Sequence, residues 1–161
     1  MTEKQAKELS AAHSTFSIEK RYAAAPARVF KAFTDMEQKR RWMIGGENWT
    51  VYSYEADFRP GGWERSRFSF KDGPEMGNDT IYHEIVRDRR MVFSYSMTFK
   101  DTVFSASLVT ITLEQDGKGT LLTYTEQGTH LDGFDNPAER EEGCRELLDK
   151  LGEELEGKLA A

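Results

Sequence analysis

The sequence predicts an α+β fold in which a curved antiparallel sheet of about six or seven strands wraps around a long C-terminal helix. Apolar side chains in residues 136–159 recur at spacings of three and four, the pattern of a helix that is buried along one face. Between residues 14 and 129, most segments alternate apolar and polar residues and are separated by short turns, as antiparallel strands are. A helix that is apolar on one face is marginal alone, so we expect the sheet to cover it.

The C-terminal helix is the most completely specified element. Asn136 can accept hydrogen bonds from the free amides of the first turn, and Pro137 has the fixed φ of a first helical residue. Glu139 stands where the acid of a capping box belongs. The expected buried face carries Cys144, Leu147, Leu148, Leu151, Leu155 and Leu159.

The N-terminal residues 1–13 are polar, and we expect them to form a flexible arm. Residues 14–161 are expected to form a single domain, because the chain is long enough for one sizeable core and shows no linker or repeat.

One strand and two short helices are expected to follow the arm. Residues 15–22 alternate like a half-buried strand. Pro26 opens a short helix with an apolar face, and a second helical turn, capped by Thr34 or Asp35, ends before Gly45. The remaining strands are expected at residues 50–59, 63–70, 78–87, 91–99, 104–115 and 120–128.

Composition excludes several classes of function. The net charge is −6, with 28 acidic against 22 basic residues, which argues against general affinity for nucleic acid or anionic membranes. No run of about 18 apolar residues and no apolar leader is present, so we expect a cytoplasmic protein without membrane insertion. The single cysteine, Cys144, cannot form an internal disulfide.

The sequence lacks the usual signatures of chemistry. It has no glycine-rich phosphate loop, no His-x-x-x-His or Cys-x-x-Cys spacing, and no Gly-x-Ser-x-Gly elbow. We therefore predict no metal and no cofactor, and we assign no catalytic residue.

A set of short segments occurs in a recognisable order along the chain. The segments are Phe16–Tyr22, 25–30 (Ala-Pro-Ala-Arg-Val-Phe), 33–35 (Phe-Thr-Asp), 41–42 (Arg-Trp), 59–63 (Arg-Pro-Gly-Gly-Trp), 82–85 (Tyr-His-Glu-Ile) and 142–151 (Glu-Gly-Cys-Arg-Glu-Leu-Leu-Asp-Lys-Leu). Together they resemble the SRPBCC (START / Bet v 1-like) superfamily, in particular the heat-shock protein 90 ATPase activator homologue family, whose domain is similar to the activator C-terminal domain. The resemblance covers about residues 14 to 157 and implies a helix-grip fold, with one strand, two helices, six strands and a final helix. It also implies a deep apolar cavity between the sheet and the C-terminal helix, and binding of lipids, hormones, polyketides or other apolar molecules.

Three functions are compatible with these observations, and the first is our leading hypothesis. The protein would bind a small hydrophobic ligand in the cavity, without being an enzyme. Alternatively, it would be an enzyme of the cyclase, hydrolase or dehydratase kind that uses acid–base residues in the cavity. A third alternative is a chaperone co-factor that, like the activators, acts on heat-shock protein 90 through its outer surface.

We expect large side chains of the strands and helices to line the cavity. Trp42 and Trp49 would form its lip, and His83 would orient a ligand or move a proton, although each also fits an ordinary structural place. Arg65 or Arg67 would hold a carboxylate if it faced inward. The inward face of each strand stays open, because a shift of one residue inverts it. The predicted ligand-binding residues are Trp42, Trp49, Trp63, Phe68, His83, Phe93, Tyr95, Met97, Phe104, Cys144 and Leu148.

The strands also suggest a contact between copies of the chain. They carry more large aromatic side chains than one interior face can take. An exposed aromatic strand edge could pair two copies into a homodimer.

Overall fold

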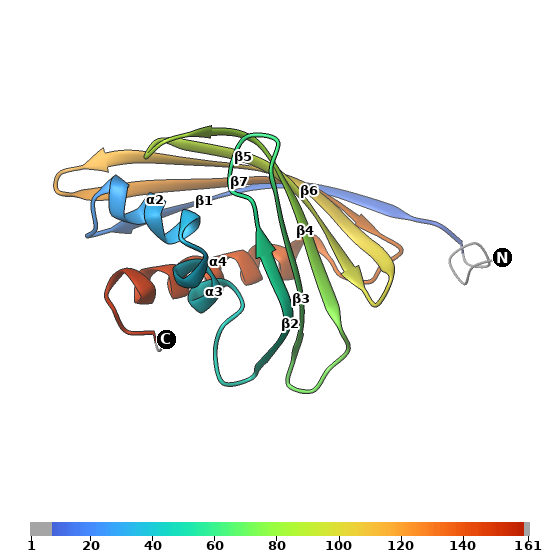
Figure 1. Ribbon diagram of the computed structural model, residues 1–161. Helices are drawn as coiled ribbons and strands as arrows, with labels where there is room; N and C mark the ends of the chain where they lie inside the picture. The colour runs from blue at the N-terminus through green and yellow to red at the C-terminus, as the bar shows by residue number, and fades with distance from the viewer. Residues whose placement is uncertain (1–7, 160–161) are drawn as a thin grey trace.

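The computed structural model describes residues 8–159, which form one seven-stranded antiparallel sheet and three helices (Figure 1). The strand order is β1-β7-β6-β5-β4-β3-β2. The elements are β1 (Ala11–Tyr22), α2 (Pro26–Thr34), α3 (Met36–Met43), β2 (Trp49–Ala56), β3 (Trp63–Phe70), β4 (Met76–Val86), β5 (Arg90–Phe99), β6 (Thr102–Asp116), β7 (Gly119–Leu131) and α4 (Pro137–Leu155).

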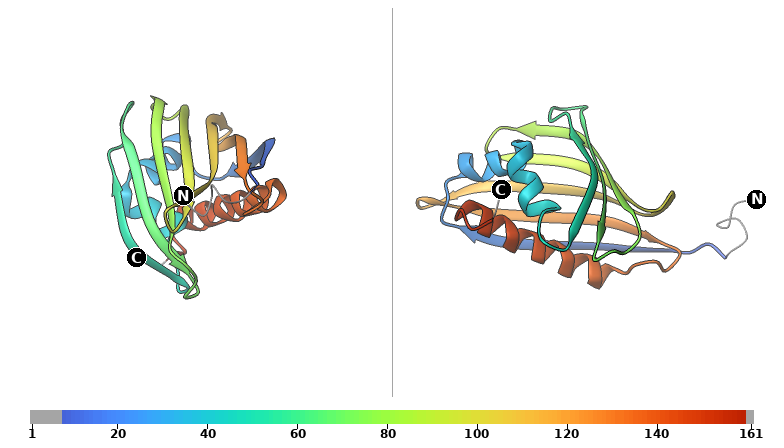
Figure 2. Two further views of the ribbon diagram at one scale, coloured as in Figure 1. Left: turned by 90° about the vertical axis from the view of Figure 1, so that its right-hand side faces the viewer. Right: turned by 60° about the horizontal axis from the view of Figure 1, so that its bottom comes forward.

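Strands β2 to β7 pair with their sequence neighbours, as short turns favour. The connection through α2 and α3 takes the chain from β1, at one edge of the sheet, to β2 at the other. The sheet is curved and α4 crosses its concave side (Figures 1 and 2). The predicted α+β helix-grip architecture is therefore confirmed.

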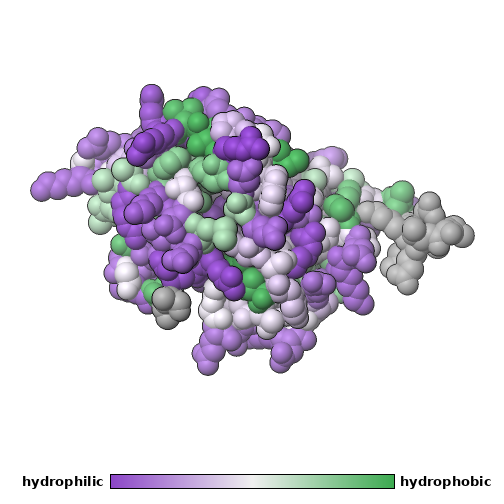
Figure 3. Space-filling model, viewed as in Figure 1, coloured by the Kyte–Doolittle hydropathy of each residue, from purple (hydrophilic) through white to green (hydrophobic). Residues whose placement is uncertain are grey.

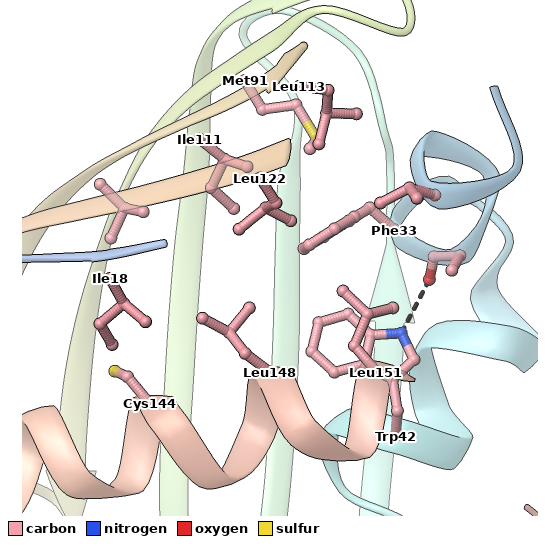
Figure 4. Close-up of a cluster of buried hydrophobic side chains, with 13 residues drawn as sticks. Ile18, Phe33, Trp42, Met91, Ile111, Leu113, Leu122, Cys144, Leu148 and Leu151 are labelled. Carbon is pink, nitrogen blue, oxygen red and sulfur yellow. Dashed lines mark hydrogen bonds between the residues drawn. The ribbon is translucent and has the colours of Figure 1, made fainter. Parts of the chain in front are cut away.

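The main core lies between α4 and the concave face of the sheet. Cys144, Leu148 and Leu151 point from α4 toward apolar side chains of the strands, among them Ile18 and Leu122 (Figure 4). Burying a large apolar side chain is worth about 1.5–3 kcal/mol, so this face holds the helix in place. Outside, the face seen in Figure 3 is covered mainly by hydrophilic residues, with hydrophobic ones in small separate groups.

The short helices close the core at one end. Phe33 of α2 packs edge-on against Trp42 of α3, with ring centroids 5.0 Å apart. The Trp42 indole donates to the Ala32 carbonyl at 2.9 Å (Figure 4). Asp35 caps α3, because its carboxylate accepts from the amides of Glu37 and Gln38, and so Asp35 rather than Thr34 is the cap.

The start of α4 is as predicted, but its end is not. Asn136 Oδ1 accepts from the Glu139 amide at 2.9 Å, and Pro137 is the first helical residue. The helix ends at Leu155, since Gly157 adopts φ +72° and the amides that follow bond back to the last turn. Leu159 therefore lies beyond the helix rather than on its apolar face.

The first strand begins earlier than the sequence suggests. β1 starts at Ala11 and pairs with β7 from there, so residues 11–13 of the expected arm 1–13 belong to the sheet. Residues 1–7 of that arm lie outside the described residues. The single domain over 14–161 stays a prediction. None of the helices in the described part of the chain is long and apolar enough to cross a membrane.

Candidate functional site

The strand register shows which side chains face the helix. Glu64 of β3 pairs with Thr80 of β4, Thr80 with Tyr95 of β5, and Tyr95 with Ser107 of β6. All four lie on the concave face, where the adjoining apolar residues enter the core. The concave face is thus partly polar, which the aromatic content of the strands does not reveal.

Most of the predicted ligand-binding residues do face the interior, in two clusters. The main core contains Trp42, Cys144 and Leu148, with Phe93 and Tyr95 packed against it. A second cluster, built on Ile44, Tyr54 and Phe68, is packed against Trp49 and Met97.

Two predicted residues lie on the convex face of the sheet instead. His83 is exposed, and its Nε2 lies 2.8 Å from the Ser94 hydroxyl. Trp63 is half-buried, with the Arg65 guanidinium 4.8 Å from its ring. Alternation explains both placements, because the neighbouring Glu64 and Tyr82 take the inward positions.

The remaining candidates lie outside the two core clusters, although Phe104 is buried, with 5% of its surface exposed. Phe104 stacks on Phe134, in the loop before α4, at a centroid distance of 4.4 Å. Arg65 is exposed, and Arg67 forms two hydrogen bonds with Asp79 at 2.8 and 3.1 Å. Neither arginine is therefore placed to bind a ligand in the interior.

A fully buried carboxylate, Glu126 of β7, is the centre of a polar network under the first half of α4. Its Oε1 accepts from the hydroxyls of Tyr95 at 2.8 Å and Tyr124 at 2.6 Å. Its Oε2 accepts from Ser107 at 3.1 Å and from Arg140 of α4 at 3.4 Å. The buried charge is thus both paired and hydrogen-bonded, as burial requires.

Arg140 connects this carboxylate to the loop before α4. Its Nη2 donates to Ser105 at 2.7 Å and to Asp135 at 2.9 Å, and its Nη1 donates to the Tyr95 hydroxyl at 3.0 Å. The other oxygen of Asp135 lies 2.8 Å from His130 Nδ1. The network therefore fixes the first turn of α4 on strands β5 to β7.

The network does not supply a nucleophile. Burial, together with the nearby Glu126 carboxylate, raises the pKa of Cys144 to about 12. Burial also raises the pKa of Tyr95 and Tyr124 well above 10. At neutral pH these groups stay protonated and act as hydrogen-bond donors to Glu126.

A second buried ion pair lies between α3 and β3. The Lys39 ammonium donates to Glu64 at 2.9 Å and to the Tyr82 hydroxyl at 3.0 Å, while Tyr82 donates to Glu64 at 2.8 Å. Lys39 is 5% exposed and Glu64 7%. Burial alone would lower the pKa of Lys39, but Glu64 and Tyr82 raise it above its usual value, so Lys39 stays charged.

A hollow of about 480 Å³ opens between the α3–β2 loop and the second half of α4. Trp49 and Phe70, which pair across β2 and β3, form its apolar wall with Leu159, and their rings lie 5.2 Å apart. Gly45 allows the loop to pass close to α3, because a Cβ there would lie 2.6 Å from a backbone oxygen. The polar wall includes Lys150 of α4, whose Nζ donates to the Gly45 carbonyl at 2.8 Å.

Comparison with known proteins gives the family. Residues 23–156 match the family model described as "Activator of Hsp90 ATPase homolog 1-like protein". The chain belongs to this family. The resemblance seen in the sequence is thereby confirmed, and the matched segment holds both buried ion pairs and all of the described hollow except Leu159.

Solved structures agree with membership of the Hsp90 activator homologue family. A putative uncharacterized protein from Rhizobium leguminosarum is 38% identical, with a TM-score of 0.88 over 93% of this chain and 99% of that one. A protein from Rhizobium loti is 48% identical, with a TM-score of 0.83 over 90% and 99%. An AHSA1-like protein from Aeromonas hydrophila, 20% identical, shares the fold, with a TM-score of 0.68 over 89% and 93%. No match was found among curated proteins.

Sequence reasoning missed the charged residues of the site in this family member, although weak signals exist. Glu126 has the same strand parity as the buried Leu122, and Arg140 precedes Cys144 by one helical turn on the same face. Lys39 precedes the buried Trp42 by three residues. Each charged residue thus continues an apolar face, which indicates a buried, paired charge.

Proposed function

We propose that this protein binds a small, largely apolar molecule at the hollow between the α3–β2 loop and α4. The observation that carries the proposal is an aromatic-walled hollow of about 480 Å³ beside the interface of sheet and helix. That volume lies within the roughly 300–1,000 Å³ that is usual for small-molecule sites. Family membership supports the same function. The chain belongs to the Hsp90 activator homologue family, and its resemblance to the SRPBCC superfamily implies apolar ligands.

The exposure of the wall favours occupation. Phe70 is 46% exposed although its neighbour Phe68 is buried at 8%. A flat or extended apolar ligand would cover Phe70 and Trp49, and removing apolar surface from water contributes roughly 25 cal/mol per Å². Core side chains pack around Leu148 and Leu151, between α4 and the sheet. The hollow is therefore a better place for a ligand than the space between helix and sheet.

Titration calorimetry with naphthalene derivatives tests this function. We expect Trp49→Ala to weaken binding at least about tenfold, because a buried aromatic contact contributes on the order of 1–3 kcal/mol. Trp63→Ala is the matched control, since Trp63 is also half-buried but lies on the convex face. The affinity of the Trp63→Ala variant for the same ligands should stay within about twofold of that of the unmodified protein.

Equal losses in the two tryptophan variants would contradict a ligand site at the hollow. Native mass spectrometry of protein purified from its own host is the complementary measurement. A co-purifying small molecule that is lost from Trp49→Ala and kept by Trp63→Ala would identify the natural ligand.

A second candidate function is contact with a chaperone of the Hsp90 type, which the family description favours. On the convex face, Trp63, Ile81 and Leu108 lie in one row of paired strand positions. Ile81 is 53% exposed and Leu108 39%, so the row offers apolar surface to a protein partner. If this function holds, the protein changes the ATPase rate of the Hsp90-type chaperone from its own host. Ile81→Asp should remove that effect, and Trp49→Ala should leave it; an unchanged rate with the unmodified protein would refute it.

A further inference from the structure

Among the buried or half-buried cations of residues 8–159, only Lys150 and Arg28 have no carboxylate within ion-pair distance, and Arg28, which donates to Gln38 and to the Glu154 carbonyl, does not line the hollow. Lys39 is paired with Glu64, Arg41 with Glu154, and Arg140 has two carboxylate partners. Within residues 8–159, Lys150 has no carboxylate within ion-pair distance, and its hydrogen bond goes to a backbone carbonyl.

The surroundings of Lys150 make an unpaired charge costly. Lys150 is half-buried, and its ammonium lies 5.6 Å from the Trp49 ring centroid, a contact that attracts the cation but supplies no counter-charge. Burial lowers the pKa of Lys150, and Glu153, three residues further along the helix, opposes the shift. An ammonium has three N–H donors, and the Gly45 carbonyl takes one of them, which leaves donors for a ligand.

The other charged groups at the hollow do not compete for this role. Arg41 donates to both oxygens of Glu154, through Nε at 3.2 and 3.0 Å and through Nη2 at 2.6 Å, so its charge is already compensated. Glu47, on the loop, is exposed, so water screens its charge. Of the two cations in the described lining of the hollow, Arg41 and Lys150, only Lys150 therefore lacks a carboxylate partner.

We infer that the hollow selects small amphipathic carboxylates, with Lys150 holding the carboxylate while the apolar body lies on Trp49 and Phe70. The inference rests on the proposed function and names the chemical class of its ligand. A carboxylate beside Lys150 would accept hydrogen bonds from the free N–H groups and supply the missing counter-charge. Such a hydrogen bond is stronger than one to a neutral oxygen. A neutral ligand of the same shape would cover the rings and leave the ammonium unpaired.

The test compares acids with alcohols of the same apolar body, using calorimetry on the full chain. The aromatic pair is 2-naphthoate and 2-naphthalenemethanol, and the alkyl pair is decanoate and decanol, so the two arms separate aromatic from fatty acids. We expect the preferred acid to bind at least about tenfold more tightly than its alcohol, with the difference shrinking as salt is added. Lys150→Gln should abolish that difference and keep the affinity for the alcohol within about twofold.

Two further variants separate the charge from the fold. Lys150→Arg keeps the charge and should retain a preference for the acid, whereas Lys158→Gln, which removes an exposed lysine beyond α4, should change nothing. Melting temperatures check that each variant is folded. Equal binding of acid and alcohol to the unmodified protein, or a preference that survives Lys150→Gln, would overturn the inference and leave the proposed function standing. Failure of all four probes to bind would overturn both.

Discussion

Arg140→Met is expected to lower the free energy of unfolding by about 3–5 kcal/mol, as measured by denaturant titration. The change removes the guanidinium that pairs with Glu126. The Glu126 carboxylate is fully buried and is then left without a charged partner. The change also removes the hydrogen bonds to Ser105 and Asp135 that fix the start of α4 on the sheet. Methionine keeps the length of the side chain and a high helix propensity, so the loss reports on the charge and its bonds.

The controls for this prediction lie on the same helix. Arg145 is 44% exposed and pairs with Glu141 one turn away, so Arg145→Met should cost no more than about 0.5 kcal/mol. The double variant Arg140→Met/Glu126→Gln should be more stable than Arg140→Met alone, because no unpaired charge remains buried. An Arg140→Met protein as stable as Arg145→Met would show that the network does not hold the helix.

Lys39→Met is expected to have a comparable effect, also about 3–5 kcal/mol. It leaves the Glu64 carboxylate buried with Tyr82 as its remaining hydrogen-bond donor among the described contacts. Thermal or denaturant unfolding measures the loss, and Arg40→Met is the control because Arg40 is the next residue of α3 and is exposed. Adding Glu64→Gln to Lys39→Met should recover part of the stability. If Lys39→Met unfolds at the same denaturant concentration as Arg40→Met, the ion pair contributes nothing to the fold.

The elements of the fold could be predicted because they depend on local patterns. Asn136 and Pro137 define the start of α4, and the three-and-four spacing of its leucines defines the buried face. The face of each strand could not be predicted, since the register depends on partners distant in the sequence. Trp63 and His83 are expected to line the cavity, yet strand alternation turns both outward.

The partners of the buried charges could not be predicted, because a place on an apolar face does not show which residue pairs with the charge. Glu126 is buried only because donors from β5, β6 and α4 converge on it. Lys39 and Glu64 are likewise 25 residues apart and meet only when α3 packs on β3. Sequence patterns record single residues, whereas a buried charge depends on its partner.

The position of the hollow could not be predicted. Trp42 and Trp49 are expected at the lip of a cavity, and the structure places Trp49 at the wall of the hollow but Trp42 in the main core. Three further residues of the lining of the hollow come from distant parts of the chain: Phe70 ends β3, Lys150 lies in α4, and Leu159 lies beyond α4. Their meeting depends on where α4 ends and on the path of the α3–β2 loop, which no short motif encodes.

The most direct test of a ligand site at this hollow is an amide ¹H–¹⁵N spectrum of the full chain during titration with 2-naphthoate. We predict that the largest shift changes fall on residues 45–49, Phe70 and Lys150, around the walls of the hollow. Changes concentrated on the convex face at Ile81 and Leu108, or no saturable change at all, would contradict it.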